Sequence, residues 1–434
     1  MSRKSSRERL DAALAKIDDP AGEGKRACLT IYREQARMAA EAADARDKAG
    51  ISLGPLDGAI VTIKDLFDVA GEVTRAGSKL IADEAKPALA DAPVIRRLRQ
   101  AGAVIVAKTN MSEFAFSGIG ANPHFGTPGN PADRKRAPGG SSSGGAVAAA
   151  DGMCEVTIGS DTGGSTRIPA SLCGITGFKP SRQRISTAGA FPLSTTLDSI
   201  GPMAKTVALC ADADAVMAGI DPSRVEPANL AGLRLGVAQG APVDNLDATV
   251  AKRFPDALAR LEKAGMRLST EKLTPLLDQM DNVNKKGGIA PTEAFAVHRD
   301  RLTRRGDMAD QIIRARIERA AKVAAADYID MLRERVDLIQ AMDARLADLD
   351  VLAMPTTPIV APLLADVVKP DEFMRWNAQV LRSTSIWNFF DTCAITLPLP
   401  REGGLPTGLM LVARNGHDRR LFAIAAAVER VFAG

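Results

Sequence analysis

The chain has 434 residues, of which 46% are hydrophobic and 25% are charged. These values are typical of a globular protein with a large core, and they exclude a disordered or fibrous chain. The 56 Lys and Arg residues nearly balance the 52 Asp and Glu residues, so that the net charge is only +4. Because no dense basic block is present, we expect no nucleic-acid partner.

Targeting and metal-binding patterns are not found. The charged first residues contain no apolar segment of the kind that a secretory signal needs, and no later run of ~18 apolar residues occurs. We therefore expect a cytoplasmic protein without a membrane partner. The 5 cysteines form no C-x-x-C pair and H-E-x-x-H is absent, so neither a disulfide framework nor a metal centre is predicted. With only 3 histidines in the chain, a Ser-His-Asp triad is disfavoured.

Hydrophobic periodicity predicts two helices within residues 1–50, and from residue 54 onward short apolar runs alternate with helical segments. The predicted strands are 59–63, 103–107, 156–159, 233–237, 351–354 and 394–397. The predicted helices include 94–100, 249–264 and 310–348. This alternation favours an α/β fold with a large mixed, mostly parallel twisted sheet covered by helices on both faces. We expect an N-terminal helical segment, 1–50, packed on the core, and a single domain, 51–434.

A first glycine and serine cluster occupies residues 139–145. It has no Lys-Ser/Thr after its last glycine, as a P-loop would, and no strand precedes Ser142, as a G-x-S-x-G nucleophile elbow would require. The cluster could also be a surface linker, because such linkers are rich in glycine and serine. A non-enzymatic nucleotide-binding loop is therefore kept only as a third alternative for the function.

A second glycine cluster, 159–170, directly follows the predicted strand 156–159. Gly163 and Gly164 permit backbone angles closed to other residues, so the N–H groups of residues 162–165 can point at one oxygen and form an oxyanion hole. Ser165 lies beside these groups and suits nucleophilic attack. A serine hydroxyl also needs a base to take its proton, and with histidine scarce that base must be a carboxylate or a lysine.

Lys64 is a candidate for this base because it follows the predicted strand 59–63. A lysine desolvated at that position would have a lowered pKa, and its neutral amine could accept a proton. The alternative is that Lys64 is an ordinary lysine exposed to solvent at the end of a strand. Its position in the sequence, taken alone, favours this alternative.

Eight motifs, which span the chain from about residue 50 to its end, together resemble the amidase signature family of Ser-Ser-Lys hydrolases. They are GPLDGAIVTIKD from residue 54, KTNMSEF from 108, PGGSSSGG from 138, GSDTGGSTRIPA from 159, GITGFKP from 174, LDSIGP from 197, MPTTP from 354 and AITLP from 394. The resemblance implies the amidase signature fold for this chain.

The resemblance also implies the roles of site residues. Ser165 is expected to be the acylated nucleophile, Ser141 the bridging serine after a cis Gly140–Ser141 bond, and Lys64 the neutral base. The expected oxyanion hole consists of the N–H groups of Thr162, Gly163, Gly164 and Ser165. The residues expected to support the loop are Ser142, Asp161 and Arg167. No cofactor and no metal are implied.

The implied function is hydrolysis of a carboxylic amide in a small, non-peptide molecule, which gives a carboxylate and ammonia or an amine. Alternatives are a urea-derivative or carbamate hydrolase of the same family, and an amidase-like glutaminase subunit of a tRNA-dependent amidotransferase. The expected partner is the small-molecule amide, and a homodimer is left open.

Substrate choice is assigned to segments 114–130, 185–196, 280–320 and 370–392. Within them, Arg314 and Arg316 are either ligands for a substrate carboxylate or solvated helix charges. An apolar pocket for an aryl or alkyl amide is the other hypothesis, and its candidate residues are Phe114, Phe116, Phe191 and Trp387.

Overall fold

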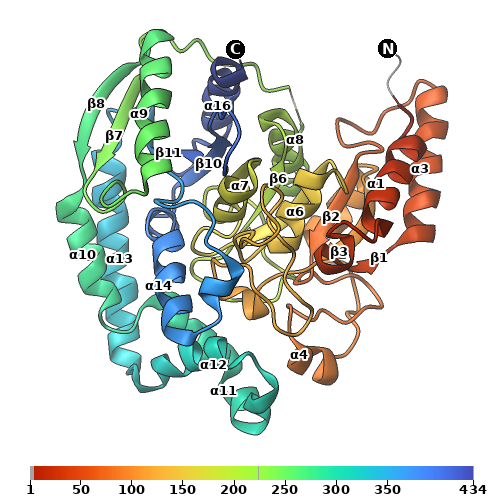
Figure 1. Cartoon of the computed structure of the whole chain (residues 1–434), viewed down its shortest axis with the longest axis horizontal. Coiled ribbons are helices and arrows are strands. Elements are labelled where there is room, and N and C mark those ends of the chain that lie inside the picture. The colour runs from red at the N-terminus through yellow and green to blue at the C-terminus, as the bar shows by residue number, and fades with distance from the viewer. Residues whose placement is uncertain (1–3, 223, 434) are drawn as a thin grey trace.

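The computed structural model describes residues 4–222 and 224–433, which are built around one sheet of 11 strands (Figure 1). The strands are β1 (Cys28–Ile31), β2 (Ile60–Lys64), β3 (Val104–Thr109), β4 (Val156–Asp161), β5 (Thr176–Lys179), β6 (Ser199–Ala204), β7 (Arg234–Gln239), β8 (Arg267–Lys272), β9 (Val351–Pro355), β10 (Cys393–Pro398) and β11 (Gly408–Ala413). Their spatial order is β1-β3-β2-β4-β6-β5-β10-β11-β9-β7-β8.

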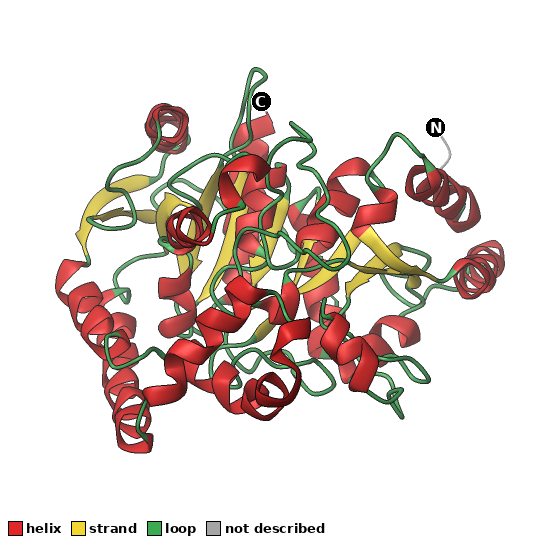
Figure 2. Ribbon diagram, turned by 60° about the horizontal axis from the view of Figure 1, so that its bottom comes forward, coloured by secondary structure: helices red, strands yellow, loops and turns green. Residues whose placement is uncertain are grey.

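Helices lie on both faces of this sheet (Figure 2). They are α1 (Ser6–Asp18), α2 (Gly24–Ala27), α3 (Arg33–Lys48), α4 (Lys79–Glu84), α5 (Pro93–Gln100), α6 (Ser143–Asp151), α7 (Arg167–Cys173), α8 (Val207–Ala218), α9 (Ala248–Lys263), α10 (Thr274–Asn284), α11 (Ile289–Arg305), α12 (Gln311–Glu318), α13 (Ala325–Arg345), α14 (Pro370–Leu381), α15 (Ser385–Phe389) and α16 (Asp418–Ala433). Short 3₁₀ turns are η1 (Glu113–Ala115), η2 (Gly306–Met308), η3 (Arg319–Lys322) and η4 (Leu364–Val367).

The large mixed sheet with helices on both faces is confirmed, but the expected predominance of parallel pairs is wrong. Four neighbouring pairs are parallel and six are antiparallel. The strands predicted from sequence are β2, β3, β4, β7, β9 and β10, and the pairs that they form with one another are all parallel. Every antiparallel pair instead includes β1, β5, β6 or β11, which are not among the predicted strands.

The N-terminal segment contains the two predicted helices, α1 and α3, and also the unpredicted edge strand β1. β1 pairs antiparallel with β3 and so extends the sheet. Leu10 and Leu14 of α1 are buried in the same hydrophobic cluster as Ile60 of β2 and Val104 of β3. Burial of such side chains contributes about 1.5–3 kcal/mol each, so the segment is held to the sheet by an apolar interface.

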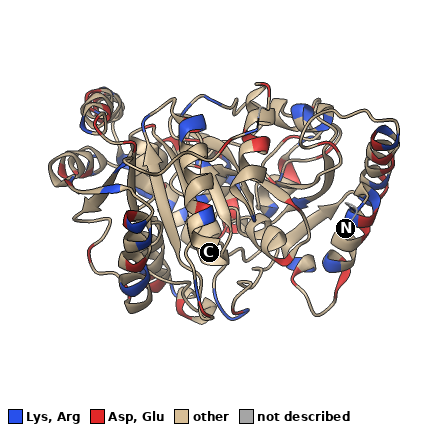
Figure 3. Cartoon of the chain, turned by 90° about the horizontal axis from the view of Figure 1, so that it is seen from above, with Lys and Arg blue, Asp and Glu red and all other residues tan. Residues whose placement is uncertain are grey.

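Basic and acidic residues are interspersed over the molecule rather than separated (Figure 3). All five cysteines are free and buried. Within residues 4–222 and 224–433, none of the helices combines the length and the apolar composition needed to cross a bilayer.

Candidate active site

Two neighbouring parallel strands bring Lys64 and the second glycine cluster to the same edge of the sheet. β2 and β4 run side by side, with Ile63 opposite Ile158. Lys64 is the last residue of β2, and β4 ends at Asp161, two residues before Gly163. Since the carboxyl ends of adjacent parallel strands meet at one edge, the lysine and the glycine-rich loop 162–166 lie beside one another.

The Lys64 side chain is fully buried, so the alternative of a solvated lysine is wrong. Its Nζ donates to Ser141 Oγ at 2.7 Å and to Ser160 Oγ at 2.9 Å. Burial lowers the pKa of Lys64 from 10.5 to about 7, although the charges of Asp161 and Asp198 oppose the shift. A large fraction of the side chain is therefore a neutral amine near pH 7, in contact with two hydroxyl groups.

Ser141 is held at the start of the segment that leads into α6. The Gly140–Ser141 peptide bond is cis, as the resemblance implies. The Ser141 carbonyl accepts a hydrogen bond from the N–H of Ser112 at 3.1 Å. A Cβ on Gly140 would lie 2.6 Å from the nitrogen of Gly120, so this close packing requires glycine. The backbone thereby fixes the hydroxyl that Lys64 contacts.

Ser160 is a site residue that the sequence analysis missed. Its hydroxyl is the second acceptor of the Lys64 amine, and its side chain is buried. The signal was present, because Ser160 is the penultimate residue of a strand, directly follows a glycine and precedes the nucleophile loop. Only the pairing of β4 with β2 shows that this hydroxyl faces the lysine.

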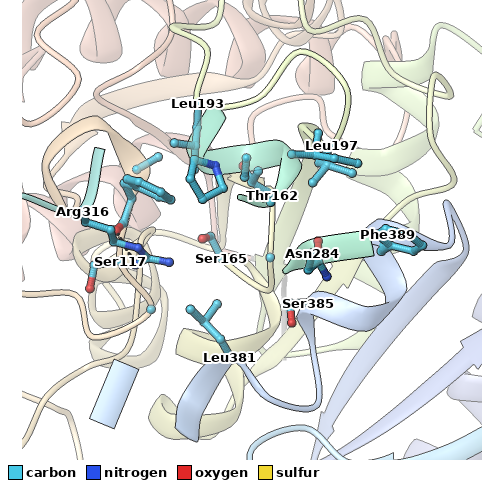
Figure 4. Close-up of a pocket in the computed structure, with 18 of the residues that line it drawn as sticks. Ser117, Thr162, Ser165, Leu193, Leu197, Asn284, Arg316, Leu381, Ser385 and Phe389 are labelled. Carbon is cyan, nitrogen blue, oxygen red and sulfur yellow. Dashed lines mark hydrogen bonds between the residues drawn. The ribbon is translucent and has the colours of Figure 1, made fainter. Parts of the chain in front are cut away.

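Ser165 lines a cavity and lies near the centre of the view in Figure 4. Its Oγ makes no hydrogen bond to any described residue, and this includes the Ser141 hydroxyl. The structure thus contains the contact from Lys64 to Ser141, with the Ser165 hydroxyl free toward the cavity. Catalytic hydrogen bonds are often long in ligand-free enzymes and tighten when substrate binds.

Three backbone N–H groups beside Ser165 are available to a ligand. Among the described residues, those of Thr162, Gly163 and Ser165 donate to no protein acceptor. The N–H of Gly164 donates to Asp161 Oδ1 at 2.8 Å, so the expectation that it belongs to the oxyanion hole is wrong. Gly164 has a φ of +132°, and a Cβ there would lie 2.2 Å from Thr384 Oγ1, which explains the glycine.

A buried ion pair between Asp161 and Arg167 stabilises the nucleophile loop. Arg167 Nη2 contacts Asp161 Oδ1 at 2.9 Å, and neither side chain is exposed. Asp161 also accepts the N–H groups of Gly164 and Thr166, while Arg167 donates to the carbonyl of Thr384. Burial opposes ionisation of Asp161, but the Arg167 guanidinium, with Lys179 and the Asn388 amide, outweighs it and holds the pKa of that carboxyl well below its usual range. The contact of Ser142 is longer, from its Oγ to the Ser160 carbonyl at 3.4 Å.

Replacing Arg167 by methionine is expected to lower the free energy of unfolding by about 3–5 kcal/mol, because Asp161 is then buried without its partner. Urea denaturation measures this change. Arg375→Met is the matched control, since Arg375 forms an exposed pair with Glu372, and its expected change is at most about 1 kcal/mol. Equal changes in the two variants would contradict a bracing role for Arg167.

The cavity in front of Ser165 has a volume of about 360 Å³ and a mainly apolar lining. Its walls come from all four segments to which substrate choice was assigned, from the nucleophile loop, and from Leu197, one residue beyond segment 185–196. The lining includes Leu193, Leu197, Arg316 and Leu381, which are labelled in Figure 4, and also Phe116. Of the four aromatic candidates, Phe116 is among the lining residues, whereas Phe114, Phe191 and Trp387 are not.

The two arginines of α12 differ in their surroundings. Arg316 lines the cavity, donates from Nη1 to the Phe116 carbonyl at 2.9 Å and stacks on the Phe116 ring at 4.1 Å. Burial lowers the pKa of Arg316 from 12.5 to about 10, and no carboxylate of the described residues pairs with it. Arg314 instead pairs with Glu318 at 2.8 Å away from the cavity, so its expected role as a substrate ligand is wrong.

These features place a serine beside free N–H groups in a pocket, with a buried lysine and a second serine behind it, and this arrangement is suited to a hydrolase. Comparison with known proteins agrees. The family model described as Amidase matches residues 9–422, and the chain belongs to this family. It is accordingly an enzyme that hydrolyses carbon–nitrogen bonds other than peptide bonds.

The similarity to individual proteins extends over most of the chain. The 2-amino-5-chloromuconic acid deaminase of Comamonas testosteroni is 35% identical over 406 residues, which cover 91% of this chain and 86% of that protein. A glutamyl-tRNA(Gln) amidotransferase subunit from Anaeromyxobacter dehalogenans (strain 2CP-C) is 33% identical over 467 residues, covering 98% and 93%. A crystal structure of an amidase superposes with a TM-score of 0.88 at 30% identity, covering 99% and 97%.

Proposed function

We propose that this protein hydrolyses the amide of a small molecule that also carries a carboxylate, through an acyl-enzyme on Ser165. The observation that carries the proposal is the buried Lys64 amine, 2.7 Å from the Ser141 hydroxyl, behind a cavity that Ser165 lines. The products are a carboxylate and ammonia or an amine.

In the proposed reaction, neutral Lys64 takes a proton from Ser141, and Ser141 takes one from Ser165 once substrate brings the two hydroxyls together. Ser165 Oγ then attacks the amide carbon, and the carbonyl oxygen, now negative, accepts hydrogen bonds from the N–H groups of Thr162 and Gly163 and from that of Ser165 itself. The proton returns along the same hydroxyls to the leaving nitrogen as the carbon–nitrogen bond breaks. Water, deprotonated by the same route, hydrolyses the ester.

Arg316 supports a carboxylate on the substrate. Its guanidinium lies in a mainly apolar cavity and has no carboxylate partner in the described chain, and an anion that enters the cavity would stabilise this charge. In Figure 4 its side chain lies beside Ser117, to the left of Ser165. The relative named for an acid, 2-amino-5-chloromuconic acid deaminase, is consistent with such a substrate.

Arg316→Gln is expected to lower kcat/KM for succinamic acid by about 10- to 100-fold, because a hydrogen bond to a charged group contributes about 1.5–3 kcal/mol. Turnover of butyramide, which lacks the carboxylate, is expected to change less than about threefold. Ammonia release measures both rates. Arg314→Gln is the matched control on the same helix and should behave as wild type. Equal losses on both substrates in Arg316→Gln would contradict the assignment.

Attack by Ser165 Oγ on a carbonyl carbon would hydrolyse a urea or a carbamate in the same way. A screen of amides, ureas and carbamates with ammonia detection separates these substrate classes. The amidotransferase alternative is favoured by the 33% identity to a glutamyl-tRNA(Gln) amidotransferase subunit. It differs from our proposal in requiring a partner chain. We expect the purified chain alone to release ammonia from an amide; turnover only after addition of a partner chain would favour the alternative.

A further inference from the structure

A second cavity, of about 510 Å³, lies against residues 193–198 and is distinct from the substrate cavity. Leu193 and Leu197 of this segment line the substrate cavity, whereas Thr195 and Asp198 line the second one. Unlike the substrate cavity, the second cavity has a mainly polar lining. Three arginines contribute to it: Arg97 of α5, and Arg182 and Arg184 of the loop after β5.

The three arginines differ in their carboxylate partners, and among the described residues Arg97 has none. Arg184 donates from Nε and Nη2 to Asp214 at 2.9 and 2.7 Å. Arg97 pairs with no carboxylate of the described residues, and its Nη1 donates to the Met217 carbonyl. Arg182 donates from Nε to the Thr196 carbonyl at 2.7 Å, and its carboxylate neighbour, Asp391, is 3.9 Å away.

Asp198 is the carboxyl group among the lining residues, and it does not neutralise Arg97 or Arg182. One of its oxygens accepts from Thr162 Oγ1 at 2.5 Å, and the other accepts from the N–H groups of Leu193 and Ser194. Burial raises the pKa of Asp198 to about 6, so the group is still mostly ionised at neutral pH. Its two oxygens are occupied by the nucleophile loop and the 193–198 segment, which leaves the Arg97 guanidinium without a carboxylate partner in the described chain.

Hydrogen-bond donors without a protein acceptor also belong to the residues that line this cavity. The loop after β5 contributes the hydroxyls of Ser186 and Thr187. In the described chain, the backbone N–H groups of Gln183, Ile185, Ser186 and Thr187 donate to no protein acceptor. Two guanidinium groups with unpaired N–H donors and a set of free N–H and O–H groups are the chemistry that binds an oxyanion.

We propose that this second cavity binds a small oxyanion, a phosphate or carboxylate group, between Arg97 and Arg182. Arg182 also donates a hydrogen bond to the Thr196 carbonyl. An anion bound to Arg182 would therefore lie next to the 193–198 segment, which forms one wall of the substrate cavity. The site is separate from the proposed carboxylate ligand Arg316, and the proposal does not depend on the reaction assigned to Ser165.

The test is calorimetric titration of inorganic phosphate into the full chain, and of succinate into the full-length Arg316→Gln protein, which lacks the proposed carboxylate ligand of the substrate cavity, at constant ionic strength set with sodium chloride. We expect saturable binding of one anion, with the stronger of the two identifying the preferred group. Arg97→Gln should weaken binding of phosphate at least tenfold, whereas Arg96→Gln, a change at an exposed arginine on the same helix, and Arg316→Gln should bind phosphate as wild type does.

Folding of Arg97→Gln is checked by its melting temperature without anion, and Arg97→Lys, which keeps the charge, should retain part of the affinity. Absence of saturable binding, equal affinity in Arg97→Gln and Arg96→Gln, or loss of binding in Arg316→Gln would each overturn the proposal. The last result would place the anion in the substrate cavity instead.

Discussion

Ser165→Ala is expected to lower kcat by about 10⁴-fold or more and to leave the fold intact. The effect on the rate is large because the proposed acyl-enzyme cannot form without the hydroxyl, and nucleophile removal in serine hydrolases has effects of this size. The effect on the fold is small because Ser165 Oγ makes no hydrogen bond within the described chain. Ammonia release and urea denaturation measure the two quantities, and the free energy of unfolding should change by less than about 0.5 kcal/mol.

Ser142→Ala is the matched control for this experiment. Ser142 belongs to the other glycine cluster, and its hydroxyl has only the 3.4 Å contact to the Ser160 carbonyl. We expect its kcat to fall less than about tenfold, since it removes one weak hydrogen bond. Residual activity above about 1% in Ser165→Ala, beyond what contaminating enzyme explains, would remove Ser165 from the role of nucleophile.

The second large effect is expected at Lys64, in both the rate and its pH dependence. The ammonium form cannot accept a proton, and burial lowers the pKa of Lys64 to about 7. The kcat/KM of wild type should therefore rise with pH, about tenfold per pH unit below pH 7, and level off above it. Lys64→Met should lower kcat/KM by about 10²- to 10⁴-fold, the usual contribution of a general base, and remove this ionisation.

The same shift has a consequence for stability. Because the folded-state pKa of Lys64, about 7, is below its ordinary value of 10.5, the unfolded chain binds more protons between these values. The contribution of Lys64 to the free energy of unfolding therefore increases as pH rises from about 7 to about 10.5. Lys64→Met should lose this component when denaturation is measured at pH 7 and pH 9.

An unchanged pH–rate profile in the Lys64→Met protein would exclude Lys64 as the base.

The sequence located the candidate catalytic residues better than the pocket, for a physical reason. Lys64, Ser141 and Ser165 each lie in a contiguous motif, and Lys64 and the loop of Ser165 come together because they follow the ends of the neighbouring strands β2 and β4. The cavity lining comes from five separate stretches of chain, so no local pattern could assemble it. Arg314 and Arg316 are two positions apart, about 200° around a helix, and only the packing of α12 shows that Arg316 faces the cavity.

The errors in the fold and loop have equally specific origins. Apolar runs identified six strands, of which all but β10 have a parallel neighbour. By contrast, β6 contains Gly201 and Pro202 and β5 contains Gly177, so these antiparallel strands gave no continuous apolar signal. Glycine content predicted an unusual backbone at Gly163 and Gly164. It could not show that Asp161 already binds the N–H of Gly164.

Trapping the covalent intermediate tests the central claim most directly. A carboxylate-bearing amide is mixed with the enzyme, the reaction is stopped with acid within milliseconds, and the protein is digested and mapped by mass spectrometry. Our account predicts an acyl group on Ser165 in wild type and none in Ser165→Ala. An acyl group on a different residue, or rapid amide hydrolysis under the same conditions in the Ser165→Ala protein, would contradict it.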